Sequence, residues 1–290
     1  MSSISRRGFF RNSAAGAALA GLFAAERQAG ANPLGLPIGS QTYPHRQRIK
    51  DGDFAGLCAD MKELGVGELE LCSPGYREFA SLADTKQAAK VLADHGLKSP
   101  SSHFTLPELR TKLPQSIAWA HELGMTQMGT ASLNGPAPNG VAAMETIKRL
   151  AEEYNKIGEQ TAQAGLQAFL HDERFEMAKA EDGRVVYEVL LELLDPKLVK
   201  MQFQMSAMRA VGDPVMYFNK YPGRFLSMHL QGVDLNAPSE RGPGVAVGKD
   251  SLDWAKIFAA AKTGGLKNYF VEQAWELTVQ SVGFLKTLEV

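Results

Sequence analysis

Several histidine, carboxylate and amide side chains stand at or just after the last residues of short apolar segments. They are His45, Glu70, His103, His171, Asp172, Gln204, His229, Gln231 and Glu272. Imidazoles and carboxylates together can transfer protons near neutral pH and can bind a divalent cation. One such residue alone has a structural explanation, but burying so many ionisable groups together without a ligand, a metal or mutual pairing would be costly. The residue types therefore predict a polar ligand site.

The apolar segments that carry these side chains alternate with longer segments of helical period. Eight runs are predicted strands, at residues 38–43, 66–71, 97–104, 125–130, 166–171, 199–204, 225–230 and 267–272. Between them apolar residues recur at three-and-four spacing, as at Leu57, Met61 and Leu64, which predicts helices packed on a parallel sheet. Eight such units predict an α/β fold, the (β/α)8 TIM barrel. An open doubly wound sheet is the alternative, but no Gly-x-Gly-x-x-Gly turn follows the first strand.

Barrel topology would give the polar side chains one common location. The carboxyl ends of all strands in a TIM barrel open on the same face, where active sites are built. His229 stands near the end of the seventh predicted strand and Glu272 at the end of the eighth. We therefore expect this imidazole and this carboxylate to meet in a single pocket.

The first 31 residues have the pattern of an export signal. Ser5-Arg6-Arg7-Gly8-Phe9-Phe10-Arg11 precedes an Ala/Gly/Leu-rich run over residues 14–25, and Ala29-Gly30-Ala31 follows. This resembles a bacterial twin-arginine signal peptide. We expect residues 1–31 to be this signal, residues 32–290 to form the barrel, and the mature protein to be periplasmic or secreted. An amphipathic N-terminal helix is the alternative, but the run has no polar face.

The charge balance and the cysteine content exclude some functions. The first 31 residues hold four arginines and one glutamate, so the remaining chain has 27 basic and 31 acidic residues and a formal charge of −4. This balance predicts no nucleic-acid partner, and we expect no membrane association of the mature form and no nucleotide cofactor. Cys58 and Cys72 lack metal or redox spacing, which favours buried free thiols.

Six segments of the chain carry a family resemblance, which is strongest over the last eighty residues. They are residues 65–71, 213–214, 221–224, 227–234, 247–254 and 269–273. In order and spacing they resemble the sugar phosphate isomerase/epimerase branch of the xylose isomerase-like TIM barrels, and the resemblance extends over residues 37–290. It implies a carbohydrate substrate and a divalent cation, which could be Mn, Co, Zn or Mg.

The resemblance also implies the residues that would hold this cation, one on each of the last four strands. His229 matches the ligand on the seventh strand and Glu272 the ligand on the eighth. On the sixth strand Gln204 stands where the family has Asp, and Leu170 aligns with the ligand on the fifth strand. A shift of one residue would place His171 there instead. A Gln amide oxygen can bind a hard cation but supplies no charge.

Roles in catalysis and substrate binding follow from the same resemblance. Glu272 would be the principal base, with Glu176 and His171 as further catalytic residues. The predicted substrate-binding residues are Glu70, His103, Asp172, Gln231 and Trp275. Two alternatives stay open: Glu176 could be a solvated loop carboxylate, and Trp275 could pack against a helix instead of stacking on a sugar ring.

Three functions are compatible with these residues. The first is an isomerase or epimerase that moves a proton next to the carbonyl of a sugar or keto-sugar derivative. The second is a lyase or hydrolase acting on 3-keto-glycosides, which uses the same acidified proton but expels an aglycone. The third is a sugar-binding protein that has lost part of its metal site. No phosphate cradle is visible, which argues against a sugar phosphate substrate, and the abasic-site endonuclease branch would need a basic DNA-binding face and more metal ligands.

Overall fold

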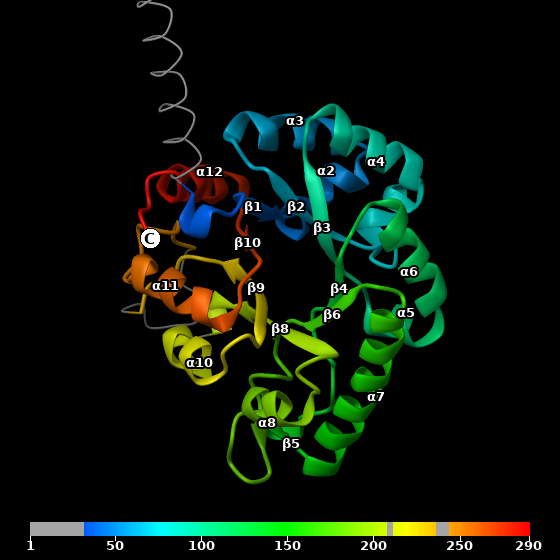
Figure 1. The fold of residues 1–290 in the computed structure, drawn as a ribbon, viewed down its shortest axis with the longest axis vertical. Coiled ribbons are helices and arrows are strands. Elements are labelled where there is room, and N and C mark those ends of the chain that lie inside the picture. Colours follow the sequence, from blue (N-terminus) through cyan, green and yellow to red (C-terminus); the bar gives the residue numbers. More distant parts are fainter. Residues whose placement is uncertain (1–31, 208–210, 236–243) are drawn as a thin grey trace, which may run out of the picture.

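The computed structural model describes residues 32–207, 211–235 and 244–290, and it contains one closed barrel of eight parallel strands (Figure 1). The strands are β1 (Gly39–Gln41), β2 (Glu68–Cys72), β3 (Lys98–His103), β4 (Gln127–Thr130), β6 (Gln167–Leu170), β8 (Val199–Gln204), β9 (Phe225–Leu230) and β10 (Asn268–Val271). Each strand pairs with the next in chain order, and β10 closes the barrel against β1. The predicted (β/α)8 TIM barrel is confirmed, and every predicted strand overlaps an observed one.

Helices form a ring outside the strands (Figure 1). The longer ones are α3 (Phe54–Leu64), α4 (Thr85–Asp94), α6 (Leu113–Glu122), α7 (Met144–Gln163), α8 (Val186–Leu193), α10 (Pro214–Lys220), α11 (Trp254–Gly264) and α12 (Trp275–Leu285). Shorter segments are α2 (Arg46–Lys50), α5 (Leu106–Thr111), η1 (Pro33–Gly35), η2 (Tyr43–His45), η3 (Arg77–Ala83), η4 (Pro138–Gly140) and η5 (Met205–Ala207), with a small second sheet of β5 (Val141–Ala142) and β7 (Lys179–Ala180). Within the described residues, no helix is both long and apolar enough to span a membrane.

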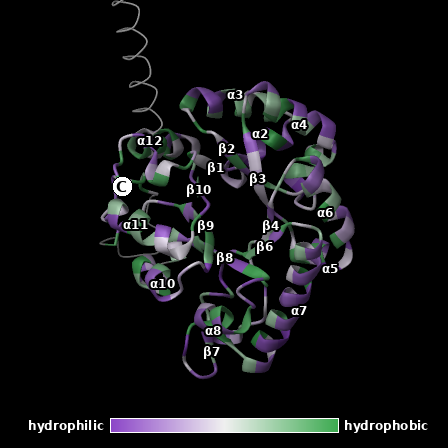
Figure 2. Ribbon diagram, in the orientation of Figure 1, coloured by the Kyte–Doolittle hydropathy of each residue, from purple (hydrophilic) through white to green (hydrophobic). Residues whose placement is uncertain are grey.

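The apolar core lies between the strands and this ring, as the green inner faces of the helices in Figure 2 indicate. Strand β8 shows the alternation that a strand imposes on its side chains. Phe203 is buried against Phe218 of α10, with ring centroids 5.6 Å apart. Gln202 and Gln204, on the other face of the strand, bond to residues at the strand ends across the barrel. The barrel interior is therefore polar at the end where the site lies.

Two kinds of glycine shape the barrel. Gly65 and Gly265 end α3 and α11 with φ of 88° and 95°, the left-handed conformation that glycine adopts without strain. Gly129 of β4 serves a different purpose, because a Cβ atom there would lie 2.3 Å from the carbonyl oxygen of Phe169. The strands β4 and β6 can therefore approach closely only because this residue has no side chain.

Two sequence predictions concern segments away from the site. The twin-arginine signal predicted for residues 1–31 lies outside the described residues. The free-thiol prediction is confirmed, because Cys58 and Cys72 are both unpaired and buried.

Candidate active site

A cavity of about 370 Å³ opens where the strands run into the loops that follow them. Its lining includes His103 at the end of β3, His171 just after β6 and Glu272 just after β10. Glu173 and Arg174 come from the connection after His171. Three of the nine polar side chains that the sequence analysis names thus line one pocket, at the end of the barrel where the topology places active sites.

The pair that we expected to meet is in contact. His229 is fully buried on β9, and its Nδ1 lies 3.2 Å from Oε2 of Glu272. Its Nε2 bonds to Oε2 of Glu70, a buried carboxylate on β2. His229 therefore lies between two carboxylates, one lining the cavity and one beneath it.

These charges set the protonation of His229. Burial on its own lowers the pKa of His229, but the negative charges of Glu70 and Glu272 outweigh burial and raise this pKa to about 10. Burial alone would raise the pKa of Glu70, but the nearby His103 and His229 lower it to about 2. In the protein without a bound cation, His229 is an imidazolium held by two carboxylates.

Glu70 is also bound on its other oxygen, in a hydrogen-bond network below the cavity. Ser101 Oγ and Gln202 Nε2 donate to Oε1 of Glu70, at 2.7 and 2.9 Å. The side-chain oxygen of Gln202 contacts Nε2 of His103 at 2.7 Å. Gln202 thus links His103 to the carboxylate that holds His229, a role that the sequence analysis did not predict.

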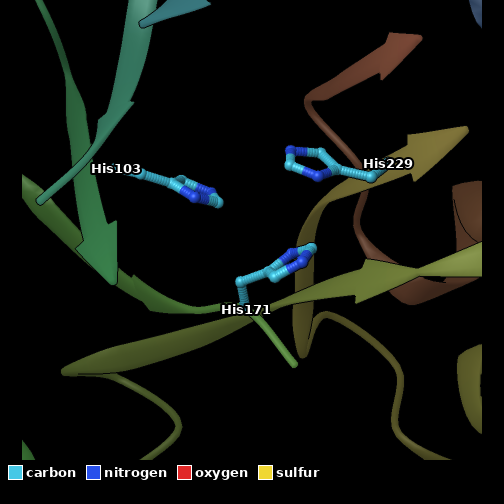
Figure 3. A group of neighbouring side chains, drawn as sticks. All are labelled: His103, His171 and His229. Carbon is cyan, nitrogen blue, oxygen red and sulfur yellow. The ribbon is translucent and has the colours of Figure 1, made fainter. Parts of the chain in front are cut away.

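Three imidazoles converge at the floor of the cavity (Figure 3). His103, His171 and His229 each place a nitrogen so that the three atoms lie within 4.8 Å of one another. Burial, followed by the charges of His229 and His103, lowers the pKa of His171 well below its usual value. His171 is therefore neutral, the form in which an imidazole binds a metal.

The donors around this floor fit a divalent cation. Nδ1 of His171 is buried without a hydrogen-bond partner, and so is Oε1 of Gln204. An unpartnered buried acceptor is costly unless a ligand or ion satisfies it. Leu170 is buried in the apolar core while His171 lines the cavity, so His171 is the one of these two side chains that could reach a cation there.

Glu272 is held in place by neutral amides as well as by His229. Gln204 Nε2 and Gln231 Nε2 donate to its Oε2, at 2.7 and 2.9 Å. Gln231 therefore orients Glu272 and does not itself line the cavity, where we expected it to bind substrate. Burial would raise the pKa of Glu272, but the charge and hydrogen bond of His229 lower it. Glu272 is accordingly an ionised carboxylate with a fixed direction.

Glu173 lies in the cavity lining, where the sequence analysis places Asp172. Asp172, predicted to bind substrate, is fully buried and its Oδ1 accepts from the backbone nitrogen of Gln204 at 2.9 Å. The next residue, Glu173, lines the cavity instead. Burial and the charges of Glu272 and Glu176 raise the pKa of Glu173 to about 7. The geometry corrects the prediction: Glu173, not Asp172, is the carboxylate of this segment that can reach a ligand.

Glu176, predicted as a catalytic residue, does not line the cavity. It is fully buried, and its carboxylate accepts from Ser132 Oγ and from the backbone nitrogens of Leu133 and Glu173, at 2.8 to 3.0 Å. These bonds tie the connection after β4 to the one after β6. Both open alternatives for Glu176 are thereby corrected, because the side chain is neither solvated nor presented to substrate.

Trp275, predicted to bind substrate, also lies away from the cavity lining. It begins α12 and is half-buried against the core. Its ring meets His45 edge to face, with centroids 6.0 Å apart. Trp275 therefore packs against its neighbours, which is the second of the two alternatives given for this residue in the sequence analysis.

Comparisons with known proteins support the fold. No protein-family model matches the chain, and no curated protein matches it. Among solved structures, the chain is similar to a sugar phosphate isomerase/epimerase from Parabacteroides distasonis ATCC 8503, with 22% identity, a TM-score of 0.69 and coverage of 86% of this chain and 93% of that one. A xylose isomerase-like TIM barrel protein from Mycobacterium smegmatis in complex with magnesium aligns at 16% identity with a TM-score of 0.63, over 87% and 95% of the two chains. An L-ribulose 3-epimerase aligns at 15% identity with a TM-score of 0.63, over 87% and 91%. The chain therefore has the (β/α)8 fold that these xylose isomerase-like barrels share.

Proposed function

We propose that this protein is an enzyme that moves a proton at the carbon next to a carbonyl group of a sugar or keto-sugar derivative, with Glu272 as the base. The observation that carries the proposal is the way Glu272 is held. His229, Gln204 and Gln231 all contact Oε2, and Glu272 still lines the cavity. A general base must be ionised, fixed and within reach of the substrate, and the lowered pKa of Glu272, its three contacts and its place in the cavity lining support this role.

A second carboxylate on the same cavity supports this chemistry. Glu173 lines the cavity together with Glu272. Proton transfer between neighbouring carbons needs one group to remove a proton and a place from which a proton returns. We assign the return step to Glu173, in place of the Glu176 that the sequence suggests.

A divalent cation would add to this reaction. His103, His171 and His229 are the cluster that would hold it. Gln204 and Glu272, which the family resemblance implies as further ligands, lie beside this cluster. When bound, such a cation polarises a carbonyl oxygen and its neighbouring hydroxyl group. The structures similar to this chain include one in complex with magnesium and one with a zinc atom.

Deuterium exchange tests the proposal. We expect the protein to exchange the hydrogen next to the carbonyl of keto-sugars in D2O, as followed by proton NMR, and Glu272→Gln to abolish the exchange while ligand affinity stays within about threefold. Glu276→Gln is the matched control, because Glu276 is exposed on α12. Exchange that persists in Glu272→Gln, or that is absent from the unmodified protein over a panel of keto-sugars, would refute the proposal.

The products of the same reaction separate the two enzymatic alternatives. An isomerase or epimerase returns the proton and gives a sugar isomer, whereas a lyase or hydrolase acting on a 3-keto-glycoside releases an aglycone. Ligand binding without any exchange would instead identify a sugar-binding protein.

We also propose that the protein is exported by the twin-arginine route. The proposal rests on Arg6-Arg7 and the small apolar run that follows them. Residues 1–31 fused to a folded reporter should direct it to the periplasm, and replacing Arg6 and Arg7 by Lys should retain it in the cytoplasm. Export that is insensitive to this replacement would refute the route.

A further inference from the structure

Part of the lining of the active-site cavity is apolar. Its larger apolar side chains are Tyr43, Tyr76, Leu106, Pro107 and Phe175, which we call the apolar wall, and within it the rings of Tyr43 and Tyr76 meet edge to face with centroids 6.3 Å apart. These side chains follow β1, β2, β3 and β6, so the wall comes from several separate connections. The ionisable groups His103, His171 and Glu272 line the same cavity. The cavity therefore offers two different environments to one ligand.

Phe79 packs against both tyrosines of the apolar wall and Arg46 against one of them, which holds the two rings in place. Tyr43 stacks on the buried Phe79, with ring planes 9° apart and centroids separated by 6.5 Å. Tyr76 meets the same Phe79 edge to face, with centroids 6.3 Å apart. Arg46 covers the Tyr43 ring, with its guanidinium carbon 4.5 Å from the ring centroid. Both tyrosines are therefore fixed before a ligand arrives, which reduces the entropy lost on binding.

Tyr43 is nevertheless partly exposed, although its ring packs on Phe79. It keeps 40% of its surface accessible to solvent. Exposed aromatic surface beside a polar pocket is typical of ligand-binding sites. Covering it with an apolar group would be favourable.

A free sugar covers this wall less completely than an aryl group does, since only the C–H face of its ring is apolar and each of its hydroxyl groups needs a partner when it is buried. A phosphate group does not match the wall. Among the described residues that line the cavity, Arg174 alone carries a fixed positive charge.

We propose that the apolar wall binds an aromatic aglycone, so that the substrate is an aryl glycoside or its keto derivative. This inference rests on the proposed function, because it assumes that the sugar ring lies on the polar floor near Glu272. The aryl group then lies against Tyr43 and Tyr76, and its apolar surface replaces water there. The wall makes the enzyme selective for glycosides over free sugars.

Equilibrium binding of unreactive glycosides tests the inference without any catalysis. We would titrate the full chain by calorimetry with the phenyl and methyl glycosides of glucose, galactose and xylose. At least one phenyl glycoside should bind about tenfold more tightly than its methyl counterpart, which corresponds to about 1.4 kcal/mol. A panel in which no phenyl glycoside is preferred would overturn the inference.

Variants of the wall make the test specific. Tyr76→Ala should abolish the preference for the phenyl glycoside over the methyl glycoside, whereas Tyr76→Phe should keep the preference because it keeps the ring. Met216→Ala is the control, since Met216 is an exposed apolar residue on α10. Thermal unfolding would show whether Tyr76→Ala is folded. If it is not, Tyr43→Ala serves in its place. A preference that survives loss of the ring would overturn the inference.

The two proposals can fail separately. Preference for phenyl glycosides together with an absence of proton exchange would refute the proposed function and leave the aglycone site in place. Exchange that depends on Glu272 together with equal affinity for phenyl and methyl glycosides would refute only the aglycone site.

Discussion

Replacement of Glu70 by Gln should destabilise the metal-free protein mainly by uncoupling His229. Glu70 is fully buried and binds His229 Nε2 through one oxygen, while Ser101 and Gln202 bind the other. Gln keeps the size of the side chain but removes the charge. The imidazolium of His229 would then have only Glu272, 3.2 Å from its Nδ1. Removing one partner of a buried ion pair typically costs about 3–5 kcal/mol.

The pKa of His229 gives a second measure of the same effect. This pKa is raised from 6.5 to about 10 in the folded protein, and at pH 7 this difference contributes about 4 kcal/mol of stability. Glu70 is the larger of the two charges that cause it, so Glu70→Gln should lose about 3 kcal/mol. The two measures concern one interaction and are not to be added.

The destabilisation caused by Glu70→Gln should depend on pH. His229 has a raised pKa when folded, so its contribution is fully present below pH 6.5 and is lost as the pH rises towards about 10. Glu70 has a pKa lowered from 4.5 to about 2, so its contribution is present above pH 4.5 and is lost as the pH falls towards about 2. The destabilisation by Glu70→Gln should therefore be largest between pH 4.5 and 6.5 and should shrink to less than about 1 kcal/mol near pH 10.

Urea denaturation of chelator-treated protein measures this effect. We would compare Glu70→Gln, His229→Gln and the double variant at pH 5.5 and near pH 10. The double variant should be more stable than the sum of the single effects predicts, by about 2 kcal/mol at pH 5.5. Glu68→Gln on the same strand is the control, because Glu68 accepts from the neutral amide of Asn268. Additive effects, or equal destabilisation at both pH values, would refute the ion pair.

Three further predictions concern other parts of the molecule. His171→Ala should weaken binding of Zn²⁺ or Co²⁺ by at least about tenfold in calorimetric titrations, and unchanged affinity would exclude this imidazole as a ligand. Burial, and then the charge of Arg48, lowers the pKa of His45 from 6.5 to about 4, so this group's contribution to stability is present above pH 6.5 and is lost as the pH falls towards about 4, by about 3 kcal/mol. His45→Gln should remove that part of the urea-unfolding pH dependence, and a profile parallel to that of the unmodified protein would contradict it. Gly129→Ala should destabilise by about 1–3 kcal/mol through overpacking, whereas Gly283→Ala, in open space on a helix, should not. Equal melting temperatures for the two glycine variants would refute the close approach of β4 and β6.

The sequence predicts the barrel well because the apolar runs, the helical spacing between them and the number of repeats all indicate the same fold. Strands β8 and β9 have the predicted bounds, at residues 199–204 and 225–230. The other predicted strands extend one or two residues beyond the observed ones at one or both ends, and the strand predicted at 66–71 stops one residue before β2 does. At several of the excess positions the side chain is apolar and buried although it lies outside the barrel ladder, as Val66 does before β2. Hydrophobic patterns detect burial, and burial continues beyond the last ladder hydrogen bond.

The candidate site is predictable in its position and less so in its details. His103, His171 and Glu272 share a cavity because parallel strands end on one face of a barrel. The exchange of Asp172 for Glu173 could not be predicted in this way, because β6 ends at Leu170 and the alternation of a strand no longer applies.

Gln202 and Glu176 differ in whether a local sequence pattern could have predicted their contacts. In β8 the polar Lys200, Gln202 and Gln204 alternate with apolar residues, and this period-two pattern could have revealed a polar barrel interior. The binding of Glu176 by backbone nitrogens depends on the approach of the connection after β4. No local pattern encodes that contact.

Gln204 explains how the site can orient its base without an acid on the sixth barrel strand. Its amide donates to Glu272 at 2.7 Å, whereas an Asp in the same place would repel Glu272 unless a cation lay between them. Gln204→Asp should therefore lower the melting temperature of the metal-free protein and increase the stabilisation by Mg²⁺ or Mn²⁺, because a second carboxylate suits hard cations. Gln204→Asn, which keeps an amide, is the control. If Gln204→Asp neither loses stability without metal nor gains affinity for these cations, then Gln204 does not lie beside a cation site, and the orientation of Glu272 depends on His229 and Gln231 alone.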